Sequence, residues 1–250
     1  MPMSQMLALS FLFFMGSVAG WVIELVFRRF FSSANPERKW INPGFCTGPY
    51  VPLYGLGLAA LYLIVSLERY SVFESVFWTR AALFVTGAAA MTAIEYAAGA
   101  LSLKLLHVRL WDYSNQWGNV RGLICPKFSL AWAALVAVYY FAIHPYILDS
   151  VAWLAQNLAF SFVIGFFYGV FVLDVAHSLQ LAARLRRFAE ENGVVVKYER
   201  LKSHIRAERD RAHEKAGFFQ PFKSSRDIAE HLREMRGEFE QRKTKSRQGH

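Results

Sequence analysis

The sequence predicts an all-α membrane protein, in which a bundle of about five transmembrane helices is followed by a basic helical tail. Its 250 residues are 54% hydrophobic and 19% charged, with 22 Phe and 7 Trp, more apolar surface than a soluble domain of this size can cover. Several apolar stretches reach the length of about 20 residues that a helix needs to cross a bilayer. The charge is uneven, because residues 181–250 hold 18 Lys and Arg against 11 Asp and Glu, whereas residues 1–180 hold ten against eight.

Five stretches are predicted to span the membrane. No charged segment precedes the first and no small-residue cleavage site follows it, so we expect a retained helix and not a removed signal peptide. His144 and Pro145 end the apolar part of the fourth stretch early, and the fourth and fifth helices could form a tight pair. The predicted spans are Met6–Phe27, Pro49–Leu67, Ala81–Leu103, Phe128 to about Leu148, and Val151–Leu173.

The orientation of the helices follows from the positions of Lys and Arg, which favour the cytoplasmic side of a membrane. If the N-terminus lies outside, the inner connections and the start of the tail hold eleven of these residues. The outer connections hold two, Arg69 and Arg80. The sequence therefore predicts an outer N-terminus and a cytoplasmic C-terminus.

The first and third spans are similar when the chain is aligned with itself at an offset of 71 residues. Eight of the 29 positions from 12 to 40 are then identical, including Glu24 with Glu95 and Trp40 with Trp111. We predict two parallel helical-hairpin repeats, a known transporter construction; the alternative is a chance similarity of two apolar hairpins. The transmembrane domain would comprise residues 1–180, with repeats at about 6–68 and 77–148 and a fifth span at about 151–180, and the tail would comprise residues 181–250.

This alignment places Glu24 and Glu95 at matching depths in their helices. A charge inside a bilayer costs at least about 2–3 kcal/mol, so each side chain should face other helices or a wet cavity. Gly16 and Gly20 share the helix face of Glu24, and Gly99 shares that of Glu95. Small residues mark faces where helices pack closely, so we expect both glutamates to point into the protein.

The surroundings of the acids leave alternatives open. Glu24 could form an ion pair with Arg28, one turn further on, that merely eases insertion. Glu95 has no basic residue four positions on, so it needs an interhelical partner, a cavity or a proton. Asp174, near the end of the last span, could join the same cavity or lie at the membrane interface beside His177.

Two predicted cytoplasmic loops carry most of the other candidate residues. Three Pro and three Gly in residues 42–55 exclude regular helix through most of the first loop, which we expect to dip into the bundle. The second loop, residues 111–122, is dense in groups that could bind a polar ligand; an interfacial aromatic belt is the alternative for its Trp and Tyr. The candidates are Asn42, Gly44, Gly48, Pro49, Tyr50 and Tyr54 from the first loop, Trp111, Asp112, Tyr113 and Asn119 from the second, and Lys127 after it.

Several motifs, in order, carry a resemblance to a known family over roughly residues 10–145. They are Gly20-Trp21-Val22-Ile23-Glu24, Asn42-x-Gly44-Phe45-x-x-Gly48-Pro49-Tyr50-x-Pro52-x-Tyr54-Gly55, Glu95-Tyr96, Trp111-Asp112-Tyr113-Ser114, Gly122-x-Ile124 and Phe128-Ser129-Leu130-x-Trp132. The chain resembles the CmpB-like bacterial membrane proteins catalogued as "putative ABC-transporter permease, type IV". The resemblance implies a transport permease of the bacterial inner membrane that works with a separate ATPase. The sequence has no Gly-x-x-x-x-Gly-Lys-Ser/Thr phosphate loop, so the chain is not expected to be that ATPase.

The tail is expected to continue the last helix to about Gly193. Helices are predicted from Val196 to about Ala216 and from Arg226 to about Arg242. Its basic residues should bind anionic lipid headgroups, at about 1 kcal/mol each near the surface. Nucleic acid is not expected, because eleven acids are interspersed and no motif is present; a docking helix pair for an ATPase is an open alternative. Cys46 and Cys125 are predicted to be free thiols, and no cofactor or metal is expected.

The leading hypothesis is a transport permease, or a permease subunit, with a polar cavity open to the cytoplasm. Glu24 and Glu95 would bind or relay a cation, a proton or a cationic substrate. The residues expected at the cavity entrance are Arg28, Asp112, Asn119 and Lys127.

Two other functions stay open at this point. One is a membrane-embedded enzyme that uses paired carboxylates on a lipid or isoprenoid. No cluster of histidines or metal-ligand spacing favours it, and His107 and His144 are predicted on opposite sides of the membrane. The other is a scaffold in which the acids fix the registration of the helices.

Overall fold

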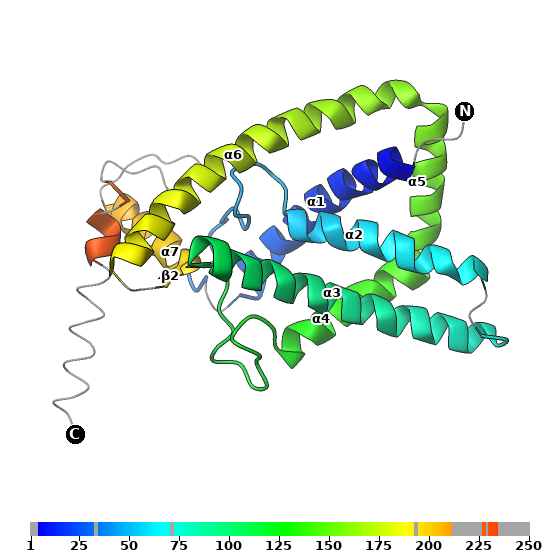
Figure 1. The fold of residues 1–250 in the computed structure, drawn as a ribbon, viewed down its shortest axis with the longest axis horizontal. Coiled ribbons are helices and arrows are strands. Elements are labelled where there is room, and N and C mark those ends of the chain that lie inside the picture. Colours follow the sequence, from blue (N-terminus) through cyan, green and yellow to red (C-terminus); the bar gives the residue numbers. More distant parts are fainter. Residues whose placement is uncertain are drawn as a thin grey trace.

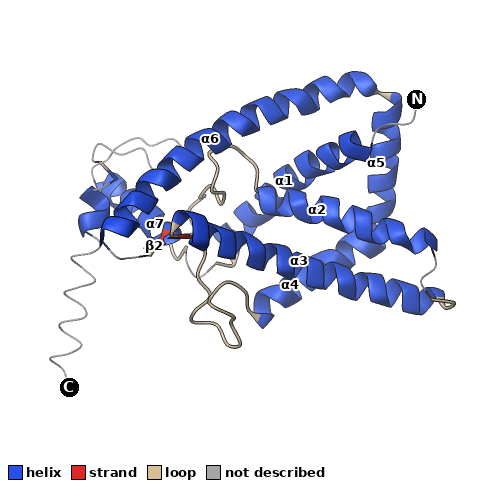
Figure 2. Ribbon diagram, in the orientation of Figure 1, coloured by secondary structure: helices blue, strands red, loops and turns tan. Residues whose placement is uncertain are grey.

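The computed structural model describes residues 5–32, 35–70, 73–192, 195–211, 227–228 and 230–234. Within them the chain is mostly helical, as Figures 1 and 2 show, which confirms the predicted all-α fold. The main helices are α1 (Gln5–Phe30), α2 (Pro52–Val65), α3 (Val76–Leu106), α4 (Pro126–Val138), α5 (His144–Gln156), α6 (Ser161–Asn192) and α7 (Tyr198–Arg211). Shorter elements are the 3-10 turns Ser66–Tyr70 and Leu158–Phe160, the π-helical turn Tyr139–Ile143, and the strands β1 (Val108–Arg109) and β2 (Val196–Lys197).

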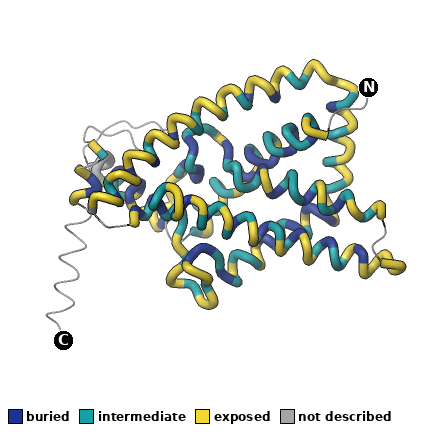
Figure 3. Tube along the Cα trace, in the orientation of Figure 1, coloured by how far each residue is buried: buried dark blue, intermediate teal, exposed yellow. Residues whose placement is uncertain are grey.

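Five helical segments of the described chain are long and apolar enough to cross a membrane. They are Gln5–Phe30, Pro52–Tyr70, Val76–Leu106, Pro126–Gln156 and Leu158–Glu191. The number agrees with the sequence prediction, and the protein is a multi-pass membrane protein. Figure 3 shows exposed residues along much of α6. Phe162, Phe166 and Leu173 of this helix are 79%, 66% and 73% exposed. Such apolar side chains suit a surface that contacts lipid.

The first four helices pack in sequence order, α1 on α2, α2 on α3 and α3 on α4. Their shared core lies between α2, α3 and α4 and is lined by apolar and aromatic side chains. It contains Leu61, Val65, Leu83, Met91, Trp132, Val136, Tyr139 and Tyr140. On the other side of α1, aromatic rings join it to α6: the ring of Phe13 stacks on Tyr168 with centroids 5.9 Å apart, and Tyr168 donates a hydrogen bond to the Ser10 carbonyl.

The α5 helix does not run beside its neighbours but crosses one end of the bundle, between α4 and α6 (Figure 1). This differs from the predicted spans, because Val151 belongs to α5 and the fifth span begins with the turn after Asn157. Asn157 ends α5: its side chain donates to the Trp153 carbonyl and its own carbonyl accepts from the Phe160 amide. The helix break therefore lies about seven residues later than the turn predicted between Leu148 and Val151, and the fifth span starts later in the chain.

The start of the tail packs onto the opposite end of the bundle, here called the tail end. Helix α6 continues without a break to Asn192, as the sequence predicted. Residues Val196 and Lys197, expected to begin a helix, instead form β2, which pairs in parallel with β1 of the second loop. The helix that follows, α7, is described to Arg211. A third helical segment follows, of which residues 228 and 230–234 are described; we refer to it as the segment 228–234. The remainder of the predicted Arg226–Arg242 helix lies outside the described residues.

A separate apolar core fixes the tail in this position. Its buried side chains come from β1, α6, β2, α7 and residue 232: Val108, Leu185, Ala189, Val196, Tyr198, Leu201, Ile205 and Leu232. The first loop joins it through Phe45, whose ring lies 5.6 Å from that of Tyr198. The tail and the loops therefore share one core, and the sequence, which treated residues 181–250 as a separate domain, did not predict this contact.

Candidate functional site

Glu24 lies near the tail end of α1 and is bonded from two helices. Arg28, one turn further along α1, donates from Nε to Glu24 Oε1 at 3.0 Å. Tyr54 of α2 donates its hydroxyl proton to Glu24 Oε2, also at 3.0 Å. Both oxygens therefore have a partner, and the intrahelical pair with Arg28 that the sequence suggested is present.

Close packing of α1 and α2 brings Tyr54 to this acid. A Cβ atom added at Gly20 would lie 2.2 Å from Cβ and Cγ of Tyr54. Only glycine leaves room for the tyrosine there, because real carbon contacts of that length do not occur. The predicted stripe of small residues is therefore the face on which α2 packs. Tyr54, which the sequence analysis assigned to the first loop, therefore lies in α2, and its hydroxyl binds Glu24.

Arg28 also reaches the tail. Its Nη1 donates to Glu199 Oε2 of α7 at 2.7 Å, so one guanidinium bridges two carboxylates. The side chains of Arg28 and Glu199 are 20% and 33% exposed. Burial alone would raise the pKa of Glu199, but the charges of Arg28 and Lys202 outweigh it and hold that pKa below its ordinary value.

Lys202, one turn after Glu199, extends this chain of charges to the first loop. Its side chain is 4% exposed, and Nζ donates to the carbonyl of Asn42 at 2.8 Å and lies 3.9 Å from Glu199 Oε1. Burial lowers the pKa of Lys202 to about 8, against the opposing effect of Glu199. We call the group Tyr54, Glu24, Arg28, Glu199 and Lys202 the ion network; it joins α1, α2, the first loop and α7.

Glu95 of α3 has a different environment. It is 3% exposed, and Tyr113 of the second loop donates its hydroxyl proton to Oε1 at 3.1 Å. The other oxygen, Oε2, is buried and has no hydrogen-bond partner among the described residues. The ring of Tyr113 is held by stacking on Phe128 with centroids 4.4 Å apart. Burial and the nearby Glu95 raise the pKa of Tyr113, which keeps its hydroxyl protonated as a donor.

Both glutamates accept hydrogen bonds from aromatic residues of the bundle and its loops, Glu24 from Tyr54 and Glu95 from Tyr113. The ring of Tyr54 lies 5.0 Å from that of Trp132 in α4. The two acids thus point toward protein and not toward lipid.

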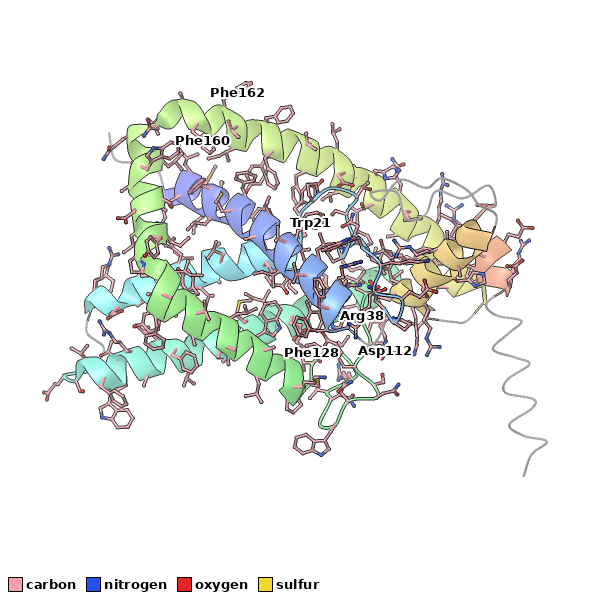
Figure 4. All side chains as sticks on the ribbon, turned by 180° about the vertical axis from the view of Figure 1, so that it is seen from behind. Trp21, Arg38, Asp112, Phe128, Phe160 and Phe162 are labelled. Atoms are coloured by element: carbon pink, nitrogen blue, oxygen red, sulfur yellow. The ribbon has the colours of Figure 1, made fainter. Side chains whose placement is uncertain are left out.

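Asp112 binds the tail instead of standing free in the second loop. Its carboxylate accepts from Ser114 and Arg109, and from Nζ of Lys197 in β2. Burial would raise the pKa of Asp112, but the bonds from Lys197 and Ser114 lower it well below its ordinary range. In Figure 4 Asp112 lies at the tail end, together with Arg38 and Phe128.

The remaining second-loop candidates shape the loop itself. Trp111 donates from Nε1 to the Leu123 carbonyl at 2.8 Å. The Asn119 amide donates to the carbonyls of Ser114 and Gln116, and its oxygen accepts from the Gly122 amide. Lys127 lies over the ring of Phe128, 5.8 Å from the centroid.

Asn42 likewise stabilises the first loop, through hydrogen bonds of its side-chain amide. It accepts from Trp21 Nε1 at 2.9 Å and donates to the Thr47 carbonyl at 2.8 Å, which closes the turn that contains Gly44. Trp21 points into this region in Figure 4. Pro49 is exposed.

Asp174 binds the first loop to α6 through hydrogen bonds. Its carboxylate accepts from the amides of Thr47 and Gly48, at 3.0 and 2.7 Å, and from the hydroxyl of Tyr50. A Cβ added at Gly48 would lie 2.3 Å from the Tyr50 ring, so the motif residues and Asp174 form one tightly fitted unit. Asp174 thus lies with the first loop, and no hydrogen bond joins it to Glu24 or Glu95 among those of the described residues.

Sequence reasoning missed Lys197, Glu199 and Lys202. The tail has a mixed charge, and nothing in the spacing of these residues distinguishes them from a solvated helix face. His107 and His144 lie at opposite ends of the bundle: His107 follows α3 at the tail end, and His144 begins α5.

Comparisons with known proteins agree with the architecture. The sequence profile of one family, described as "Putative ABC-transporter type IV", matches residues 11–179. That range begins within α1, includes both loops, and ends within α6. Neither a curated protein nor a solved structure matches the chain. Since the profile covers more than half of the chain, and the motifs that carry the resemblance build the loops and acid sites described above, the protein is a member of the type IV family of ABC-transporter-like membrane proteins.

Proposed function

We propose that the chain is a membrane-embedded transport permease, or the permease subunit of a transporter, in which Glu95 binds or relays a cation, a proton or a cationic substrate. One observation carries the proposal: Glu95 is almost fully buried, its polar neighbours Tyr113 and Trp132 are uncharged, and its Oε2 atom makes no hydrogen bond that meets the usual geometry within the described residues. A carboxylate in this situation needs a proton or a cation, because an unpaired buried charge is strongly unfavourable.

Glu24 would have a supporting part. Its charge is already balanced by Arg28, and both of its oxygens accept hydrogen bonds. A second carboxylate in the same bundle would favour the arrival of a proton or cation at Glu95. Because Arg28 of the ion network also binds Glu199 of α7, the charge around Glu24 would depend on the position of α7.

A carbodiimide reagent tests the chemistry of Glu95 without a known substrate. Dicyclohexylcarbodiimide modifies protonated carboxyl groups in apolar surroundings, and mass spectrometry locates the product. We expect modification of Glu95 that declines as pH rises and is suppressed by a bound cation. Glu24, paired with Arg28, is the internal control and should stay unmodified. Equal modification of both acids, insensitive to pH and cations, would contradict the proposal.

Transport itself can be measured in liposomes that contain a pH-sensitive dye. In separate liposome samples, a Na⁺ gradient or a K⁺ gradient is imposed across the membrane. Each gradient should drive proton movement when the wild-type protein is present. Replacing Glu95 with Gln should reduce the movement to that of empty liposomes, whereas replacing the exposed Glu74 with Gln should leave it unchanged. Wild-type flux in Glu95→Gln would remove Glu95 from the transport path.

We also propose that the tail end is cytoplasmic and that the transporter's ATPase, where one takes part, is a second polypeptide. The excess of Lys and Arg in the connections at the tail end supports this orientation. The absence of a phosphate-loop motif from the sequence supports a separate ATPase. A membrane-impermeant thiol reagent should modify a cysteine placed at the exposed Asn115 only in inverted vesicles; modification in right-side-out vesicles would reverse the orientation.

A further inference from the structure

A cluster of potential metal ligands lies in the tail, away from the intramembrane acids. It consists of His204 of α7 and of His231 and Glu234 of the helical segment 228–234. Their ligand atoms all lie within 4.8 Å of one another. Ligands of a tetrahedral zinc ion are separated by roughly 3.4 Å, since each lies about 2.1 Å from the metal, so modest side-chain movement would complete a site.

The contacts within the cluster hold these side chains together. His204 Nε2 lies 3.4 Å from Glu234 Oε2, and the two imidazole rings meet edge to face with centroids 5.4 Å apart. Although His204 Nε2 is buried, it makes no hydrogen bond to any described group. A buried nitrogen that faces a carboxylate and a second imidazole is suited to bind a metal, which would satisfy it.

The core beneath the cluster fixes the backbone on which the ligands stand. Ile205 and Leu232, next in sequence to the two histidines, are buried in the core that joins the tail to the loops. His231 is itself fully buried, whereas the side chain of Glu234 is 43% exposed. The site is therefore anchored on its inner side and accessible from solvent through the carboxylate.

We propose that His204, His231 and Glu234 bind Zn²⁺ and that the metal joins α7 to the segment 228–234. Two imidazoles and a carboxylate are a ligand set that zinc accepts in proteins, with water in the fourth position. Because 26 residues separate His204 from His231 in the sequence, their spacing does not resemble a metal-binding motif, and no metal site was expected. Because α7 also carries Glu199 and Lys202, a metal here would hold the helix in the position that the ion network requires.

Zinc binding is tested on the full chain, purified in detergent without a histidine tag and treated with a chelator. Titration with Zn²⁺ by calorimetry should give one site per chain, and Co²⁺ should give the visible absorption of a tetrahedral nitrogen and oxygen site. Zinc should also raise the temperature of unfolding, because it binds only the folded tail.

Three variants identify the ligands. Replacing His204 with Gln or His231 with Gln should weaken zinc binding more than about tenfold and abolish the stabilisation by zinc, since each removes one of three ligands. Glu234→Gln keeps the size of a partly exposed side chain and should weaken zinc binding without affecting folding. It therefore distinguishes the loss of a ligand from a loss of binding caused by misfolding. His177→Ala, an exposed histidine of α6, is the matched control and should bind zinc normally.

The same titrations can overturn the proposal. If the wild type binds no zinc at stoichiometric concentration, or if all three variants bind it as the wild type does, His204 and Glu234 form an ordinary ion pair beside a packed histidine.

Discussion

Arg28 of the first transmembrane helix donates a 2.7 Å hydrogen bond to Glu199 of α7, which is 171 positions away in the sequence. The contact links an intramembrane acid, Glu24, with a segment that composition alone assigns to a basic tail. It also implies that movement of α7 changes the charge balance around Glu24, because Arg28 would then lose one of its two carboxylate partners.

Breaking this contact should release α7 from the bundle. Arg28→Gln leaves both carboxylates without their shared cation, and because the pair is partly exposed we expect a loss of about 1–3 kcal/mol in the docking free energy of α7. Limited proteolysis of the tail measures the change. Arg186→Gln, which breaks an exposed pair with Glu190, is the control and should cost less than about 0.5 kcal/mol. Equal protease resistance in both variants would show that the Arg28 contact contributes nothing to docking.

Docking of α7 should strengthen as pH rises from about 8 to 10.5. Burial lowers the pKa of Lys202 to about 8, below its ordinary value of 10.5, so in this interval the undocked tail binds more protons than the docked tail. Docking therefore becomes more favourable with rising pH, by at most about 3–4 kcal/mol. The distance between spin labels at the exposed positions Asn115 and Ser203 reports docking.

Lys202→Met supplies the control for this experiment. It removes the titrating group, so the dependence on pH above 8 should disappear. A dependence that persists unchanged in this variant would assign the effect to another group.

Space for Tyr54 beside Gly20 should be essential to the first hairpin. Gly20→Ala places a Cβ atom 2.2 Å from Tyr54, which forces α1 and α2 apart and weakens the bond from Tyr54 to Glu24; we expect a loss of about 1–3 kcal/mol in stability. Unfolding in a series of detergent mixtures measures it. At Gly165 of α6 no atom lies within 4 Å of an added Cβ, so Gly165→Ala should be neutral or stabilising by up to about 1 kcal/mol. Similar losses in both variants would indicate a general effect of helix substitution.

Asp174 should keep Cys46 unreactive by closing the first loop. Burial, together with the nearby charge of Asp174, raises the pKa of the Cys46 thiol to about 12, and the side chain is 4% exposed. Asp174→Asn removes an acceptor from the amides of Thr47 and Gly48, so the loop should open and maleimide modification of Cys46 should accelerate by at least about tenfold. A Cys125→Ser background makes Cys46 the reporter; an unchanged rate would mean that the loop is held by its other contacts.

Much of the fold follows from the sequence because the bilayer imposes simple requirements. A spanning helix needs a long apolar run, and five such runs were found with nearly correct boundaries in α1, α2 and α3. The break between α5 and α6 was misplaced, because hydropathy does not distinguish an apolar helix that spans the bundle from one that crosses its end. The turn at Asn157 includes a hydrogen bond from its side chain to the Trp153 carbonyl. Hydropathy averaged over a stretch of sequence does not detect such a bond.

The sequence by itself determined the family, the apolar helices and the inward direction of Glu24 and Glu95, because an acid within a bilayer has few places to point. The sequence also suggested the pair of Glu24 with Arg28, but only the tertiary structure showed the other groups that meet these acids. Tyr113 reaches Glu95 through the second loop, while the tail supplies Glu199 and Lys202 to the charges around Glu24. Hydrogen bonds between residues more than a hundred positions apart leave no periodic pattern in a chain, and so the partners of a buried charge become visible only once the helices are packed.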